Sequence, residues 1–332
     1  MLADDGARLG YRASAVRVGD QDVPVALWYP VVGEQAAAVG PFTAHTYAYR
    51  VSIAHIFREM LGWRLPACCR RTFDLSSRLP VAVNAPMSKE ITRLVLLAHG
   101  HLGSPFDLLH VAETFAPLGF VVAAPEFADS VSGGVTPSGA AADRGAVVDA
   151  VIQRFQADGF ETSLFLGHSK GGGTAVRTAL QSRWRLGRVC ICADDAADYR
   201  GQDPLLTIAS QGDTTFTSDW AAFFQSIKRQ AAGGLYAGAG GAAELAADLN
   251  PPRMSALLFT PPDPDVPLPS HVSFIDSRVS AALVRVGRPL FPLARCLGVD
   301  VLGLDTFANR PDGDACSAMV LPAIVRWAES RK

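Results

Sequence analysis

The pattern of hydrophobic and polar positions changes its period repeatedly from about residue 90 onward. Short runs that are almost wholly apolar alternate with longer segments in which apolar residues recur with the period of a helix. This alternation predicts a mostly parallel sheet with helices on both faces. The expected strands are 93–100, 119–126, 162–169, 188–195, 204–211 and 254–260, and the expected helices are 106–117, 140–157, 171–183, 217–231 and 315–330.

The chain before residue 93 departs from this alternation. Residues 23–30 alternate well enough to form an antiparallel strand at the start of the sheet. In the long stretch that follows, apolar residues recur at helical spacing: Ile53, Ile56, Phe57, Met60 and Leu61. We therefore expect a helical insert over 35–90. We favour a helix packed over the edge of the sheet, and the alternative is a lid, or a lipid-facing surface over 50–65.

Length and composition favour one domain. The chain has 332 residues, of which 49% are hydrophobic, which is enough to bury one large core. We therefore expect a single domain over 1–332. Residues 233–252 are rich in Gly and Ala, which predicts a loop near the edge of the sheet that would carry the active site.

Charge and hydropathy exclude two classes of protein. The formal net charge is −2, with 30 basic and 32 acidic residues mixed along the chain, so we expect no nucleic-acid partner. No apolar run approaches the roughly 18–20 residues of a membrane span. The N-terminal MLADDGARLG carries two acids and no apolar core, so we expect no secretory signal.

The cysteines favour a reducing compartment. Six occur, at positions 68, 69, 190, 192, 296 and 316, and Cys190 and Cys192 point to the same side of an expected strand. No CxxC or Cys/His spacing indicates zinc, and we expect neither a metal nor an organic cofactor. We expect reduced thiols, in the cytoplasm or an organelle such as a plastid. Cys296 and Cys316 are the one pair to check for a bridge.

The stretch LFLGHSKGGG contains a G-x-S-x-G motif made by Gly167, Ser169 and Gly171. An apolar strand pattern precedes it and a helical pattern without proline follows it. This context is typical of a nucleophile elbow, in which the serine takes a strained backbone conformation between strand and helix. The flanking glycines let strand and helix approach closely. The alternative is a glycine-rich turn without a catalytic role.

A serine hydroxyl needs a base and a site for the oxyanion. Of the seven histidines only His271 lies C-terminal to Ser169, where this topology places the base. The oxyanion would be bound by two backbone N–H groups. We expect one from Lys170, directly after the nucleophile, and one from His101, in the loop after the strand 93–100.

The acid of the triad has more than one candidate. Asp213 lies just past the strand 204–211, the commonest place for it, and we favour it. Asp194 and Asp195 end the strand 188–195 and could also reach the imidazole. Any one of these carboxylates could hold His271 in the tautomer that accepts a proton.

With these residues together, the chain resembles the α/β-hydrolases. Within that fold it resembles the platelet-activating-factor acetylhydrolases and the chlorophyllases, and more broadly the dienelactone-hydrolase-like group. The motifs that carry the resemblance are ALWYP, LLAHGHLGS, GFVVAAPEFADS, LGHSKGG and HVSFID. Both closer families place the acid after the strand that follows the elbow, which matches Asp194 or Asp195. Chlorophyllases have Asp-Pro-x-Asp there, and this chain has Asp195-Ala196-Ala197-Asp198, without the proline.

The resemblance implies a serine esterase that acts on a lipophilic ester, either a phospholipid acyl ester or the phytyl ester of a chlorophyll. Separately from the resemblance, the apolar stripe of the expected helix leads us to predict peripheral membrane contact through 50–65. One alternative is a general small-ester, thioester or polyester hydrolase with the same machinery. An alternative of another class is a catalytically silent binding protein of the same fold.

Overall fold

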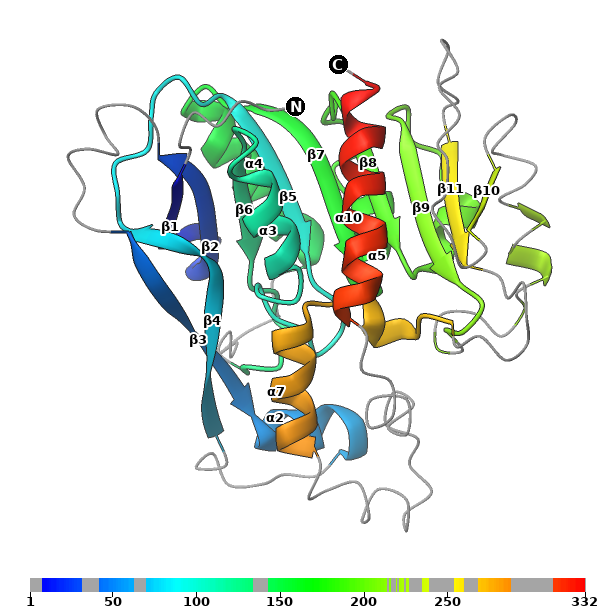
Figure 1. The fold of residues 1–332 in the computed structure, drawn as a ribbon, viewed down its shortest axis with the longest axis horizontal. Coiled ribbons are helices and arrows are strands. Elements are labelled where there is room, and N and C mark those ends of the chain that lie inside the picture. The colour runs from blue at the N-terminus through cyan, green and yellow to red at the C-terminus, as the bar shows by residue number, and fades with distance from the viewer. Residues whose placement is uncertain are drawn as a thin grey trace. The chain divides into compact units, whose positions relative to one another are not determined.

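A computed structural model gives the fold of the protein (Figure 1). It describes residues 8–31, 42–62, 70–133, 143–213, 215, 219, 221–223, 225–226, 235–238, 254–259, 268–287 and 313–331. The chain forms two compact units, residues 1–165 and 166–332.

The first unit contains strands of both directions. Its strands are β1 (Arg8–Val18), β2 (Gln21–Val31), β3 (Thr43–Ser52), β4 (Arg70–Val83), β5 (Arg93–Ala98) and β6 (Val121–Pro125), and its helices are α2 (Ile53–Leu61), α3 (Leu109–Phe115) and α4 (Arg144–Ala157). The strand order is β5-β6-β2-β1-β4-β3. β5 and β6 are parallel, whereas β2 pairs antiparallel with β6. The predicted antiparallel strand at the start of the sheet is therefore confirmed as β2.

The second unit is built on parallel strands. β7 (Glu161–His168) begins in the first unit and ends in the second, where it is followed by β8 (Gly187–Ile191), β9 (Leu205–Ser210), β10 (Leu235–Gly238) and β11 (Met254–Phe259). The order is β10-β11-β9-β8-β7, and the pairs of β8 with β9, β9 with β11 and β10 with β11 are parallel. The helical elements are α5 (Lys170–Arg177), η1 (Asp194–Asp198), η2 (His271–Phe274), α7 (Ser277–Gly287) and α10 (Gly313–Glu329).

The strands β8, β9 and β11 of the second unit are mostly apolar because both of their faces are covered. Every residue of β8, β9 and β11 is buried. The C-terminal helix α10 packs on these strands through Trp327, which is buried and donates its indole N–H to Ser255 in β11. A strand buried on both faces has no solvent-exposed side, which is why these sequences are nearly continuous apolar runs. The charged exception is Arg188 in β8, which forms an ion pair with the buried Asp203 at 2.9 Å.

The segment 35–90 differs from its prediction. The helix expected at Ile53 is confirmed as α2, but the described remainder consists mainly of the long antiparallel pair β3 and β4. The prediction of a helical insert was therefore wrong for most of the segment. In β3 the residues Tyr47, Tyr49 and Val51 are buried and their neighbours Ala48 and Arg50 are exposed. This period of two is that of a strand with one covered face.

Other expectations fall partly outside the described residues. Most of 233–252 and of the expected helix 217–231 is not described, and Leu235–Gly238 forms β10 where a loop was predicted. Within the described ranges, no helix is long and apolar enough to cross a membrane. The mostly parallel sheet with helices, and the strand–turn–helix at the end of β7, are those of an α/β-hydrolase-type fold, which confirms the predicted fold class.

Candidate active site

Ser169 lies on a strained turn between β7 and α5. Its φ is 56° and its ψ is −127°, a combination that a residue with a Cβ rarely adopts. Its N–H donates to the carbonyl of Ile191 at 2.8 Å, and its own carbonyl accepts from the N–H of Gly173 at 3.1 Å. The strain is thus maintained by hydrogen bonds to β8 on one side and into α5 on the other. The predicted elbow conformation is present.

The glycine before the serine is required by the close approach of strand and helix. A Cβ at Gly167 would lie 2.0 Å from the backbone oxygen of Gly171, a distance no side chain could occupy without moving the backbone. A Cβ at Gly172 would lie 3.1 Å from Ala193 and from Cys190, so α5 also approaches β8 closely. These contacts explain the run of small residues around the elbow.

His271 and Asp213 form a short hydrogen bond within the second unit. The imidazole Nδ1 donates to Oδ2 of Asp213 at 2.6 Å, and the other carboxylate oxygen accepts from the N–H and the hydroxyl of Thr215 at 2.9 and 2.7 Å. The Asp213 side chain has no exposed surface, and that of His271 is 11% exposed. Because Nδ1 carries the proton in this bond, the lone pair of the neutral ring lies on Nε2, where it can accept a proton.

The environment of Asp213 favours its ionised form. Burial by itself would raise the pKa of this carboxyl, but the hydrogen bond and charge of His271, together with the hydrogen bonds from Thr215, lower it below its ordinary value. A buried carboxylate that stays charged can stabilise a cationic imidazole. Asp213 and His271 therefore have the arrangement of an acid and a base that act together.

The structure separates the candidate acids. Asp195 lies in η1 and pairs with Arg177 of α5 at 2.8 Å. Asp194, next to it, is the first residue of η1. The imidazole has a single Nδ1 proton, and Asp213 accepts it. The geometry therefore joins His271 to Asp213, at the place that the general pattern of the fold predicts.

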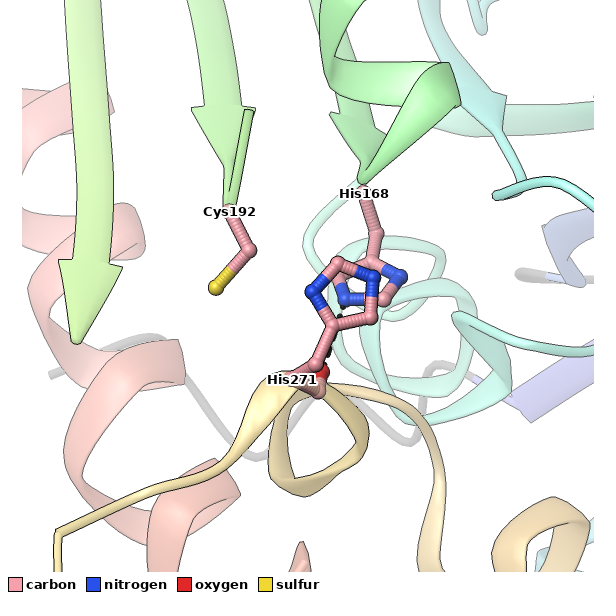
Figure 2. Close-up of side chains that lie close together, drawn as sticks. All are labelled: His168, Cys192 and His271. Carbon is pink, nitrogen blue, oxygen red and sulfur yellow. Dashed lines mark hydrogen bonds between the residues drawn. The ribbon is translucent and has the colours of Figure 1, made fainter. Parts of the chain in front are cut away.

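A further histidine, which the sequence analysis did not consider, links the elbow to His271. His168 is the last residue of β7, and its Nε2 donates to the backbone carbonyl of His271 at 2.9 Å. The two ring centroids are 4.7 Å apart. Figure 2 shows the two imidazole rings side by side. This contact brings η2 beside the turn that carries Ser169. The only sequence signal for it is that His168 precedes the serine directly.

The two expected oxyanion donors belong to different units. Lys170 is the first residue of α5, and the N–H groups of the first turn of a helix have no partner within the helix. His101 lies in the first unit, in the loop after β5, and its side chain is 44% exposed and contacts Asp129.

The loop of His101 is held by a partly buried arginine at the start of α4. Arg144 donates to the carbonyl oxygens of His99 at 2.7 Å and of Gly100 at 3.0 Å, and to the carboxylate of Asp129 at 2.8 Å. Its side chain is 11% exposed, and its guanidinium lies 4.3 Å from the centre of the Phe127 ring. Both peptide groups before His101 therefore have a fixed orientation.

His99 restrains the same carbonyl group. Its Nδ1 donates to the Gly100 oxygen at 2.7 Å, and its Nε2 accepts the N–H of Phe127 at 3.0 Å. The ring is therefore neutral in the folded protein. Burial, followed by the nearby charge of Arg144, lowers the pKa of His99 to about 3.

No family model and no curated protein matches this chain in sequence. Among solved structures it is similar to a ferulic acid esterase from Streptomyces cinnamoneus, at 17% identity over 69% of this chain and 70% of that one, with a TM-score of 0.41. It is similar to a dienelactone hydrolase from Anabaena variabilis at 14% identity, over 80% and 89% of the two chains, with a TM-score of 0.41. For an esterase from Pyrococcus furiosus the identity is 12%, the coverages are 76% and 82%, and the TM-score is 0.40.

Proposed function

We propose that the protein is a serine carboxylester hydrolase in which Ser169, His271 and Asp213 form the catalytic triad. The observation that carries this proposal is the 2.6 Å hydrogen bond between His271 and the buried Asp213, formed beside an elbow with a strained Ser169. That bond leaves a basic nitrogen on the imidazole, and the contact of His168 with His271 anchors the base next to the elbow.

The proposed reaction has two half-reactions. The Nε2 atom of His271 takes the hydroxyl proton of Ser169 as its oxygen attacks the ester carbonyl, and the same proton then goes to the departing alcohol. Water repeats the sequence on the acyl-enzyme, which releases the acid and restores the hydroxyl. The buried Asp213 carboxylate stabilises the imidazolium that forms in each half.

We further propose that Arg144 positions an oxyanion donor. In a trans peptide the carbonyl oxygen and the N–H of the next residue point in opposite directions. No cis peptide bond occurs in the described residues, so the hydrogen bonds that fix the carbonyl of Gly100 also fix the direction of the His101 N–H. Arg144 would thus act on the oxyanion through the backbone of the loop, without contact with substrate.

For the substrate we propose a lipophilic ester, as the resemblance to acetylhydrolases and chlorophyllases implies. In α2 the side chains of Ile53, Ile56 and Phe57 are only partly buried, which supports contact of this segment with an apolar group or a lipid surface. Rates on a short-chain phospholipid, a chlorophyll and a simple aryl ester would test this. Preference for the aryl ester, with no activity on the other two, would instead favour a general small-ester hydrolase.

The test of the proposed function is Ser169→Ala. We expect its kcat/KM on an aryl ester to fall by about 10⁶-fold, because the nucleophile is lost. A fluorophosphonate probe should label the wild-type protein and not this variant. Ser14→Ala, which removes an exposed hydroxyl in β1, is the matched control and should keep both activity and labelling. A folded wild-type protein that neither hydrolyses esters nor reacts with the probe would favour the silent binding protein.

A further inference from the structure

The two oxygens of the Asp213 carboxylate have different partners. Oδ2 accepts the Nδ1 proton of His271 at 2.6 Å, whereas Oδ1 accepts two hydrogen bonds from Thr215, one from its backbone N–H at 2.9 Å and one from its hydroxyl at 2.7 Å. The Asp213 side chain has no exposed surface. Because bulk water does not reach the carboxylate, donors from the protein decide which way each oxygen faces.

The imidazole side of this pair is fixed independently of Asp213. His271 is the first residue of η2, and a capping box made by Ser270 and Ser273 holds that turn, with the N–H of Ser270 donating to the hydroxyl of Ser273 at 3.0 Å. His168 donates to the carbonyl of His271 at 2.9 Å. The backbone that carries the imidazole is therefore held by bonds that do not involve the carboxylate.

The backbone of Asp213 is also fixed, but the torsion of its carboxylate needs a further restraint. The N–H of Asp213 donates to the carbonyl of Ser210, the last residue of β9, at 3.0 Å. The torsion about the last bond of an aspartate side chain is broad, so a fixed backbone does not set it. This torsion decides whether a lone pair of Oδ2 faces Nδ1 of His271. The hydrogen bonds to Oδ1 are those that oppose its rotation.

Thr215 is suited to restrain this torsion by its side chain. Its N–H and its hydroxyl reach the same oxygen from two atoms, so the carboxylate cannot pivot about one bond without lengthening the other. Branching at Cβ restricts χ1 of threonine and keeps the hydroxyl in place. The residue itself is exposed, so packing does not require a threonine at this position.

We propose that Thr215 is a positioning residue whose hydroxyl holds the Asp213 carboxylate in the orientation that accepts the Nδ1 proton of His271. That bond keeps the ring proton on Nδ1 and leaves the lone pair on Nε2. The consequence for hydrolysis rests on the proposed function, whereas the orientation of the pair does not and can be measured without activity.

Thr215→Val removes the hydroxyl and keeps the backbone N–H and the shape of the side chain. We expect kcat on an aryl ester to fall about tenfold with KM nearly unchanged, because a hydrogen bond to a charged group is lost and the hydroxyl acts only through the acid and the base. Thr215→Ser restores the donor and should stay within about threefold of the wild type. Thr72→Val makes the same change at an exposed threonine in β4, and this matched control should keep the wild-type kcat.

Proton NMR reports on the acid–base pair directly. A proton between an imidazole nitrogen and a carboxylate in a short, charge-assisted hydrogen bond resonates far downfield. This resonance should be present in the wild type and absent in His271→Gln. In Thr215→Val it should move upfield or exchange with water too fast to be seen, and in Thr215→Ser it should remain.

An unchanged downfield resonance in Thr215→Val would overturn the proposal, whatever the rates. A rise in KM with an unchanged kcat would overturn it as well, because the hydroxyl would then act on the substrate. Fewer sites that react with a fluorophosphonate, with kcat per reactive site unchanged, would mean that Thr215 contributes only to folding. If the resonance changes as expected in a protein without esterase activity, the positioning role is supported and the proposed function fails.

Discussion

The corner that contains Ser169, Asp213 and His271 differs in kind from the loop that contains His101. In the first, the proposed roles belong to side chains, and the short bond between imidazole and carboxylate sets them. In the second, the proposed role belongs to one backbone N–H. The side chains of His99 and Arg144 act there only by holding carbonyl oxygens.

This difference determines what a substitution does in each region. At the corner, a new side chain removes a charge, a proton carrier or a nucleophile, so the chemistry changes while the backbone stays. In the loop, a new side chain leaves every reacting group present and changes only the direction of a donor. The corner should therefore show large losses of rate, and the loop should show smaller ones that depend on how much restraint remains.

Asp213→Asn should have the largest effect of the predicted changes in this comparison. An amide can donate to Nδ1, which would place the ring proton on Nε2 and abolish the base. We expect kcat to fall by about 10³–10⁴-fold with little change in KM. Steady-state kinetics on an aryl ester measure this, with a fluorophosphonate titration to count folded, competent sites.

Asp195→Asn is the matched control, because it neutralises a carboxylate at the same end of the sheet. Its partner Arg177 is 68% exposed, so the pair contributes little to stability. We expect a change in kcat of less than about tenfold. If kcat instead fell strongly in Asp195→Asn and stayed near the wild-type value in Asp213→Asn, the acid of the triad would be Asp195 in η1. That is the position the acetylhydrolases and chlorophyllases use.

Arg144 provides the corresponding test of the loop. Arg144 donates from two nitrogens of a planar fork, whereas the lysine ammonium is one compact group that does not reproduce this geometry. We expect Arg144→Lys to lower kcat about tenfold, and Arg144→Met about 100-fold, with KM nearly unchanged in both, because the oxyanion forms only in the transition state. If Arg144 contributed only to folding, fewer protein molecules would react with the fluorophosphonate. The kcat calculated per reactive site would then equal that of the wild type.

Arg154→Lys is the control on the same helix. Arg154 is 61% exposed and pairs with Asp158 within α4, so its replacement should leave kcat and the count of active sites at wild-type values. If Arg144→Lys behaves in the same way, the guanidinium does not position the donor and the contrast between the two regions disappears.

Periodicity was enough to predict most of the fold. The buried parallel strands read as mostly apolar runs because both of their faces are covered. The elbow could be recognised because Gly167 is imposed by steric contact with α5. The proposed base followed by elimination, since His271 is the only histidine after Ser169. The choice of Asp213 was open in the sequence, because distance to the imidazole depends on how the loops after β8 and β9 fold.

Features made by contacts between distant residues could not be predicted. A helical insert was predicted where the strands β3 and β4 lie. The prediction extended the helical spacing of the apolar residues in α2 to the whole segment 35–90. Arg144 lies 44 residues from Gly100 in the chain, and nothing in its neighbourhood marks it as a partner of a backbone carbonyl. The hydrogen bond of His168 to the carbonyl of His271 likewise joins residues that are 103 positions apart in the chain.

The loop also predicts how stability depends on pH. His99 has an ordinary pKa of 6.5 when unfolded and about 3 when folded, so between these values the unfolded state binds more protons. The free energy of unfolding therefore rises with pH across this window, and the stabilisation is lost as pH falls from 6.5 toward 3. The largest slope that one group can contribute is about 1.4 kcal/mol per pH unit.

His99→Gln isolates this contribution. The buried His55 and the partly buried His45 also have lowered pKa values, so the informative quantity is the difference in slope between the variant and the wild type. Denaturant unfolding between pH 6.5 and 4.5 avoids the window of Asp213, whose pKa lies below 3.8 and whose stabilisation is lost only at lower pH. We expect a lower free energy of unfolding for the variant at pH 7. Below pH 6.5 its free energy of unfolding should change less steeply with pH, by up to about 1.4 kcal/mol per pH unit. Well above pH 7, where His99 is unprotonated in both states, the two pH profiles should be parallel. Parallel curves through the acid window as well would mean that the ring is protonated equally in both states, and the restraint on the Gly100 carbonyl would then come from Arg144 without help from a neutral imidazole.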